Sequence, residues 1–168
     1  MKRFVYRFKA MSTPCELIIF AAEKVKADSA AEAVLTETKR LEKKYNYYTT
    51  DSYLNAINQR ETDQLDQESK TLLQRAKQYY QATDGIFDIT VATIKELYRS
   101  EDDPQILAQK KEQLLPFVGC DHFSIKRDKI VFDNPYTRID LGGFVKEYAV
   151  DRAVGVLKKH KISSAMVN

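Results

Sequence analysis

Hydrophobic and polar residues alternate near the start of the chain, over residues 3–9, where the aromatic residues Phe4, Tyr6 and Phe8 occupy every second position. A period of two is typical of a strand with one buried face. More continuous apolar runs elsewhere indicate strands that are buried more deeply. By these signals, strand-forming segments are expected at residues 3–9, 15–21, 123–132, 137–141 and 162–167, the third as a hairpin around the polar residues 126–129.

Apolar residues spaced three or four positions apart predict helices in the middle of the chain and near its end. Asp28 or Ser29 can cap the first long helix. Asp84 and Gly85 end the second, because glycine tolerates the left-handed conformation found past a helix C-terminus. Long helices are expected at residues 29–46, 69–82 and 145–159, with shorter helical segments at 52–58, 90–99 and 104–115.

Strands at both ends of the chain, with helices grouped between them, predict an α+β fold with a mostly antiparallel sheet and helices packed on one face. We expect the strands to share one sheet. No linker rich in Pro, Gly or Ser divides the sequence, so residues 1–168 are interpreted as part of one domain. Because the apolar segment 162–167 runs up to the last residue, the chain is expected to be truncated within its sheet.

Composition excludes several classes of function. Acidic and basic residues are interleaved and the formal net charge is only +3, so neither a nucleic-acid-binding surface nor a polybasic membrane anchor is predicted. No apolar run approaches the roughly 20 residues of a membrane span, and the N-terminus lacks the apolar stretch of a secretion signal. A cytoplasmic location is therefore expected. Cys15 and Cys120 lie far apart without CxxC spacing, so no disulfide framework or metal knuckle is indicated.

The segment with the clearest chemistry is residues 140–151 (DLGGFVKEYAVD), where a predicted strand ends in an acid, two glycines follow and a helix begins. The free N–H groups of a helix N-terminus attract phosphate, and a bare glycine carbonyl is a suitable ligand for a hard cation. The same pattern also fits a capped strand-to-helix turn without a ligand. Spacing alone leaves both interpretations open.

This segment resembles the D-L-G-G-I-A-K-G-Y-A-V-D motif of FAD:protein FMN transferases, the ApbE family. It departs from the motif at Phe144, Val145 and Glu147. The first two substitutions keep apolar packing. Glu147 replaces a glycine with a negative side chain, which is expected to weaken the binding of a diphosphate.

Three other segments resemble motifs of the same family and occur in the family's order. Residues 10–14 (AMSTP) are similar to A-M-G-T-P, with Ser12 in place of glycine, and residues 48–58 are similar to Y-x-x-D-S followed by Asn. Residues 85–91 (GIFDITV) resemble G-A-F-D-P-T-V. Four motifs in register cover nearly the whole chain, but only about the N-terminal half of the family's domain.

The resemblance implies a role for each matching residue. Met11 would line a flavin pocket and Tyr48 would pack on a ring, while Gly143 would supply its carbonyl to Mg²⁺. The FAD itself, which is the substrate, would be contacted by Ile86, Phe87, Asp88, Asp140 and Lys146. Simpler interpretations exist beside these: Met11 and Phe87 as core residues, Asp88 as a helix cap, and Lys146 as a solvated lysine. No catalytic residue is assigned.

The reaction implied by the resemblance is Mg²⁺-dependent transfer of FMN from FAD to a Thr or Ser of an acceptor flavoprotein. The family's G-G-D turn, its histidine and its Asp/Thr metal ligands have no counterpart here, and neither His122 nor His160 stands in the histidine's place. The chain alone is therefore expected to be inactive, with a separate chain as one source of the C-terminal half. A non-catalytic flavin-binding or protein-interaction remnant is the alternative. Many relatives are exported lipoproteins, whereas this sequence shows no signal.

Overall fold

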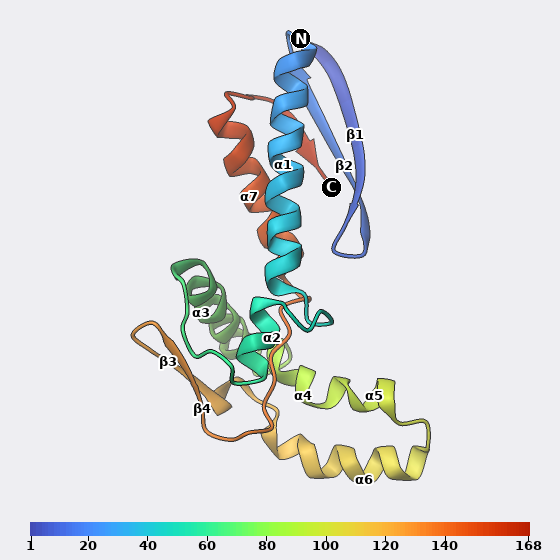
Figure 1. The fold of residues 1–168 in the computed structure, drawn as a ribbon, viewed down its shortest axis with the longest axis vertical. Coiled ribbons are helices and arrows are strands. Elements are labelled where there is room, and N and C mark those ends of the chain that lie inside the picture. The colour runs from blue at the N-terminus through green and yellow to red at the C-terminus, as the bar shows by residue number, and fades with distance from the viewer. The chain divides into compact units, whose positions relative to one another are not determined.

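Residues 1–168 are described by a computed structural model, in which the chain divides into two units (Figure 1). The first unit contains Met1–Tyr53 and Gly142–Asn168, and the second contains Leu54–Leu141. The content is mixed helix and antiparallel sheet, which confirms the predicted α+β class.

The first unit contains a three-stranded antiparallel sheet in the order β1-β2-β5. Its strands are β1 (Lys2–Ala10), β2 (Thr13–Ala21) and β5 (Ala165–Val167). The helices α1 (Lys24–Tyr45) and α7 (Val145–Lys159) pack on one face of it, as predicted (Figure 1). Phe4, Tyr6 and Phe8 all pack against the core between the sheet and these helices, so the alternation in the sequence marks the buried face of β1. The shared core of the sheet and helices contains Leu17, Ile19, Ala21, Ala27, Ala30, Ala31, Val34, Ala153, Leu157 and Ile162.

The long helix α1 begins at Lys24, five residues before the predicted start at Ser29, so the predicted cap was wrong. Glu23 precedes the helix without a side-chain cap, and Asp28 instead accepts hydrogen bonds from Lys24 Nζ and from the hydroxyl of Tyr6. Asp28 therefore links the helix to β1 and does not cap it. The predicted helix 145–159 begins and ends at the expected residues.

The second unit is mainly helical. Asp66 caps α3 by accepting from the Ser69 N–H, and the left-handed Asp84 and Gly85 follow the end of that helix as predicted. The helices of this unit are α2 (Tyr53–Asn58, from Leu54 onward), α3 (Gln67–Ala82), η1 (Ile89–Val91), α4 (Ala92–Lys95), α5 (Leu97–Ser100), α6 (Pro104–Leu114), η2 (Leu115–Phe117) and η3 (Cys120–His122).

The predicted hairpin at 123–132 is confirmed as β3 (Phe123–Lys126) and β4 (Lys129–Phe132), but it forms a sheet of its own. The expectation that all strands share one sheet was therefore wrong. An isolated bridge between Gln64 and Lys129 is the one further pairing of this hairpin.

The predicted strand at 137–141 is not formed. Side chains are the hydrogen-bond partners of the backbone of residues 137–139, in place of a neighbouring strand. The amide of buried Asn58 donates to the Ile139 carbonyl at 2.9 Å and accepts from the Ile139 N–H at 2.8 Å. Thr93 accepts from the Arg138 N–H in the same way. The apolar sequence identified burial correctly, but burial does not require a ladder when side chains supply the partners.

Candidate functional site

The β1–β2 turn forms one wall of a pocket in the first unit. Because Ala10 pairs with Thr13, Met11 and Ser12 are left as a two-residue loop, and both have positive φ angles of 51° and 61°. This geometry suits the twist of a hairpin but normally uses Asn or Gly. Other residues pay roughly 1–2 kcal/mol each in the left-handed region. The turn therefore holds a strained conformation at the one motif position where the sequence has Ser12 in place of glycine.

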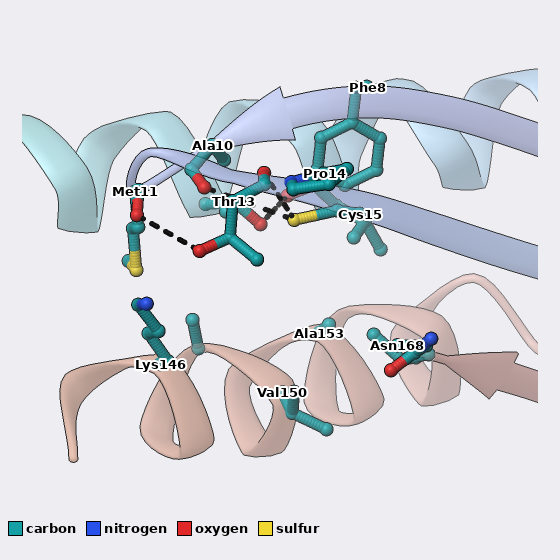
Figure 2. Close-up of a pocket in the computed structure, with 14 residues that line it drawn as sticks. Phe8, Ala10, Met11, Thr13, Pro14, Cys15, Lys146, Val150, Ala153 and Asn168 are labelled. Carbon is teal, nitrogen blue, oxygen red and sulfur yellow. Dashed lines mark hydrogen bonds between the residues drawn. The ribbon is translucent and has the colours of Figure 1, made fainter. Parts of the chain in front are cut away.

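The pocket has a volume of about 140 Å³ and is lined mostly by apolar side chains from β1, β2, α1, α7 and β5. Figure 2 shows the Met11 side chain pointing from the turn toward Lys146 on α7. Met11 and Lys146, both predicted to contact FAD, thus line the same pocket. Among the other lining residues are Phe8, Pro14, Cys15, Val150, Ala153 and Val167. The pocket therefore combines a mostly apolar lining with the cationic side chain of Lys146.

Lys146 lies in the first turn of α7, where the helix has no side-chain cap. Amide groups in this position attract anions, and a lysine beside them adds to the effect. Glu147 is in the same turn and opposes both contributions with its negative charge. Gly143 is exposed in the turn immediately before α7.

Tyr48 does not line this pocket. It lies in the loop after α1, is 57% exposed and packs edge-on against Tyr47, with ring centroids 5.4 Å apart. The Tyr48 N–H donates to Oδ1 of Asn46 at 2.9 Å, which fixes the backbone of the loop beside the exposed ring. Its predicted flavin contact remains a prediction.

In the second unit, the predicted contacts Ile86, Phe87 and Asp88 follow one another just before η1. Ile86 is 90% exposed, whereas Phe87 is half-buried and packs edge-on against Tyr79 at 5.7 Å. The simple core interpretation therefore does not describe Phe87 fully. Ile86 and Phe87 present apolar surface to solvent next to Asp88.

Asp88 caps η1, as its simpler interpretation predicts. Its Oδ1 atom accepts from the Thr90 N–H at 2.7 Å, from the Thr90 hydroxyl at 2.6 Å and from Cys120 Sγ at 3.5 Å. All three contacts go to one oxygen, so the cap does not use Oδ2. A cap and a ligand contact are therefore compatible in this side chain.

Asp140 lies beside the same segment, because its N–H donates to the Ile89 carbonyl at 2.8 Å. Its carboxylate is ion-paired with Lys95 of α4. The second unit thus brings Asp88 and Asp140 to one region. Lys95 was missed in the sequence, where it is only one polar position of a predicted helical segment, and the motif at 85–91 stops before it.

Cys120 is buried next to Asp88, and it is a poor nucleophile. Burial, and then the negative charge of Asp88, raise the pKa of the Cys120 thiol to about 12. The thiolate is the reactive form of cysteine, so the thiol is inert at neutral pH. It acts as a hydrogen-bond donor to Asp88.

No group of three or more His, Cys, Asp or Glu residues is arranged to hold a metal ion. Mg²⁺ requires near-octahedral oxygen coordination, so the Gly143 carbonyl is at most one ligand of several. His122 hydrogen-bonds Asp133 at 3.2 Å and His160 is the residue after the end of α7, and both histidines are half-buried.

The fold is that of flavin transferases of known structure. The ApbE protein of Thermotoga maritima superposes on 99% of this chain with a TM-score of 0.86 at 25% identity, and 56% of its own length is covered. The flavin transferase ApbE of Vibrio cholerae gives a TM-score of 0.87 at 18% identity, with 99% of this chain and 57% of that protein covered. The apo flavinyl transferase ApbE of Pseudomonas stutzeri gives 0.87 at 20% identity, covering 99% and 58%.

This chain belongs to the ApbE family, whose sequence model matches residues 11–168. It is also 33% identical over 114 residues to the FAD:protein FMN transferase of Chlamydia pneumoniae, covering 64% of this chain and 36% of that protein. The chain therefore spans well under two thirds of the length of each of these relatives. None of its helices combines the length and the apolar character that crossing a membrane requires.

Proposed function

We propose that residues 1–168 are the N-terminal part of an ApbE-like flavin transferase domain, which transfers FMN from FAD to a Thr or Ser of an acceptor flavoprotein with the help of Mg²⁺. The observation that carries this proposal is the pocket of the first unit, where Met11 and Lys146 face one another (Figure 2). The family membership and the transferase relatives support the same chemistry.

In the proposed reaction, the acceptor hydroxyl oxygen forms a bond to the FMN-side phosphorus of FAD. The bond from that phosphorus to the bridging oxygen breaks, AMP leaves with that oxygen, and the hydroxyl proton is released to a base. Such reactions depend on positioning and on neutralising phosphate charge. Lys146 would supply positive charge at the phosphates, and the apolar wall would exclude water from one side of the ligand. Bound Mg²⁺ would supply further charge neutralisation.

Further polypeptide is needed to complete this site, because the base and most of the metal ligands have no candidate here. The outer edge of β5 supports this part of the proposal. Glu16 exchanges two hydrogen bonds with Asn168, so by alternation the N–H and C=O groups of Ala165 and Val167 point away from β2. An open edge of this kind is a template for another strand. The added segment would follow in the same chain or come from a separate one.

The alternative is a non-catalytic flavin-binding or protein-interaction remnant. Glu147 favours it, because it places a negative charge in the helix turn proposed to face a diphosphate. The two proposals agree on flavin binding and differ on transfer.

Flavin binding is tested by titrating FAD against the chain and following the flavin fluorescence. Lys146→Ala should weaken binding by about 10- to 150-fold, since a charge-assisted contact is worth about 1.5–3 kcal/mol. Lys158→Ala is the matched control, because it removes an exposed lysine at the opposite end of the same helix. Equal effects of the two variants would contradict the assignment of the pocket.

Transfer is tested by mixing the chain with FAD, Mg²⁺ and an acceptor flavoprotein, with and without the C-terminal portion of an ApbE relative. Mass spectrometry reads the product as a covalent FMN adduct. We expect an adduct only in the complemented mixture, and its loss with Lys146→Ala. Complementation without any adduct, while FAD still binds, would support the remnant.

A further inference from the structure

We infer that Glu42 is a positioning residue for the pocket: its carboxylate holds the left-handed β1–β2 turn to α1 and so keeps Met11 directed at Lys146. This inference rests on the proposed function for its purpose, but its structural basis is separate. The N–H of Met11 donates to Oε1 of Glu42 at 2.6 Å.

The N–H of Met11 needs a partner from outside the hairpin. In a two-residue hairpin loop the flanking residues, here Ala10 and Thr13, close the ladder, and the first loop residue donates to neither strand. The Thr13 hydroxyl donates to the Met11 carbonyl at 3.3 Å, so the loop supplies partners for other groups but not for this N–H. A carboxylate is the strongest acceptor that a side chain offers to it.

The turn also has an unusual need for support. Neither Met11 nor Ser12 is a residue that adopts the left-handed region readily, yet both do so in succession. Backbone conformations of this kind persist only where surrounding contacts over-determine them. Glu42 provides such a contact from α1, and the residue before it in that helix, Leu41, is fully buried. The anchor is therefore fixed by the core of the unit.

Glu42 acts through the turn and not on the ligand. It is not among the residues that line the pocket, whereas Met11 is. Figure 2 shows the Met11 side chain extending from this turn toward Lys146, so a change in the turn's backbone would redirect that side chain. The structure thus assigns to Glu42 the placement of one pocket wall.

The inference makes Glu42 and Ser12 energetically coupled. A glycine at position 12 adopts positive φ without steric cost, so it would make the anchor less necessary. Ser12→Gly should therefore rescue the turn when Glu42 is lost. A residue that only stabilised α1 would show no such rescue.

The experiment uses four variants: Glu42→Ala, Glu42→Gln, Ser12→Gly and the double variant Glu42→Ala with Ser12→Gly. Glu32→Ala, at an exposed position of the same helix, is the matched control. The first readout is hydrogen exchange of the Met11 amide by NMR. The second is the methyl signal of Met11, which is easy to resolve because the chain has only 3 methionines. The third is FAD affinity.

We expect Glu42→Ala to accelerate exchange at Met11 by at least about tenfold, to shift its methyl signal and to weaken FAD binding by about tenfold. Glu42→Gln keeps an acceptor oxygen and should stay within about threefold of the parent, because a neutral hydrogen bond has about half the strength of a charged one. The double variant should return the methyl signal and the affinity close to the parent values.

Unchanged exchange and methyl signal in Glu42→Ala would overturn the inference, and so would a defect that Ser12→Gly does not relieve. A parent chain that binds no FAD would contradict the proposed function instead. In that case the exchange rate and the methyl signal, which need no flavin, still decide for or against Glu42.

Discussion

The side chain of Asp140 is ion-paired with Nζ of Lys95, at 2.5 Å from Oδ2, within the second unit. The aspartate that motif similarity assigns to FAD therefore has a cation beside it. A diphosphate approaching this region would meet a lysine as well as a carboxylate. Lys95 consequently belongs with Asp88 and Asp140 as a residue to test for ligand contact.

Replacing Lys95 with methionine should lower the free energy of unfolding by about 1–3 kcal/mol, because the largely buried carboxylate of Asp140 would lose its charged donor. Chemical denaturation at neutral pH measures this loss. Lys129→Met is the control, since its pair with Asp63 is half-exposed on both sides and should contribute less than about 1 kcal/mol. Equal losses in the two variants would mean that the burial of Asp140 does not increase the contribution of its ion pair to stability.

The stability of the protein should fall in alkaline solution because of Cys120. Its pKa is about 12 in the folded state against 9.0 for an unperturbed thiol. Between these values the unfolded chain has lost a proton that the folded chain keeps, so the thiol's contribution is complete below pH 9 and is lost as the pH rises toward 12. The expected slope is at most about −1.4 kcal/mol per pH unit.

Urea unfolding of the parent and of Cys120→Ala at pH 8, 9 and 10 measures that slope. The variant should be less stable at every pH but should show a shallower decline above pH 9. Tyr6, whose pKa is also raised to about 12, first by burial and then by its bond to Asp28, adds a decline that begins nearer pH 10. Parallel curves for parent and variant would show that Cys120 ionises normally in the folded state.

Acid should weaken the first unit through Glu37, which joins α1 to α7. Its carboxylate accepts from Arg40 and from Arg152, and mainly the Arg40 bond lowers its pKa from 4.5 to about 2. A lowered pKa stabilises the fold above about pH 4.5, and that contribution is lost as the pH falls toward 2. Glu37→Gln should cost roughly 1–2 kcal/mol at pH 7, after allowance for the solvent exposure of both arginines.

The comparison of unfolding free energies at pH 7 and pH 3 checks this prediction. The gap between parent and Glu37→Gln should narrow in acid, because at pH 3 Glu37 of the unfolded parent, with its ordinary pKa of 4.5, has bound a proton that the folded parent has not. Glu32→Gln, at an exposed position of the same helix, should differ from the parent by the same free energy of unfolding at both pH values. A constant gap for Glu37→Gln would show that its charge does not support the helix pair.

Sequence patterns predicted those strands and helices in which apolar residues recur at a regular spacing. The alternation over residues 3–9 gave both the type and the buried face of β1 correctly, and the apolar spacing over 145–159 gave the type and the bounds of α7. The patterns did not predict which strands pair with one another. The sequence of an apolar hairpin does not indicate which sheet it joins, and here β3 and β4 form a two-stranded sheet of their own.

The candidate site residues also differ in whether the sequence alone could indicate them. Met11 and Lys146 were predicted from motifs and line one pocket, although the motifs carry no distance information. Glu42 and Lys95 were not predicted, because each acts through a partner far away in the sequence, Met11 and Asp140 respectively. A glutamate or lysine on a helix gives no sequence signal that separates such a contact from a solvated position. Only the fold reveals these pairs.

The segment 137–141 yields the last prediction, because its expected strand was replaced by a side-chain clamp. Asn58 offers its amide to Ile139 as a neighbouring strand would, with one bond in each direction. Asn58→Ala would leave a buried N–H and a buried C=O without partners, and each such group costs about 1–3 kcal/mol. We expect a loss of about 2–4 kcal/mol in the free energy of unfolding, together with faster hydrogen exchange at the Ile139 amide.

Gln59→Ala is the matched control, because Gln59 is the exposed neighbour of Asn58 in the sequence and should change stability by less than about 0.5 kcal/mol. Asn58→Asp separates the two bonds of the clamp: its carboxylate keeps an acceptor for the Ile139 N–H but offers no donor to the Ile139 carbonyl. This variant should therefore retain slow exchange at Ile139 while still losing stability. If Asn58→Ala leaves exchange at Ile139 slow, another group must protect that amide, and the side-chain clamp would not explain why this buried segment does without a strand partner.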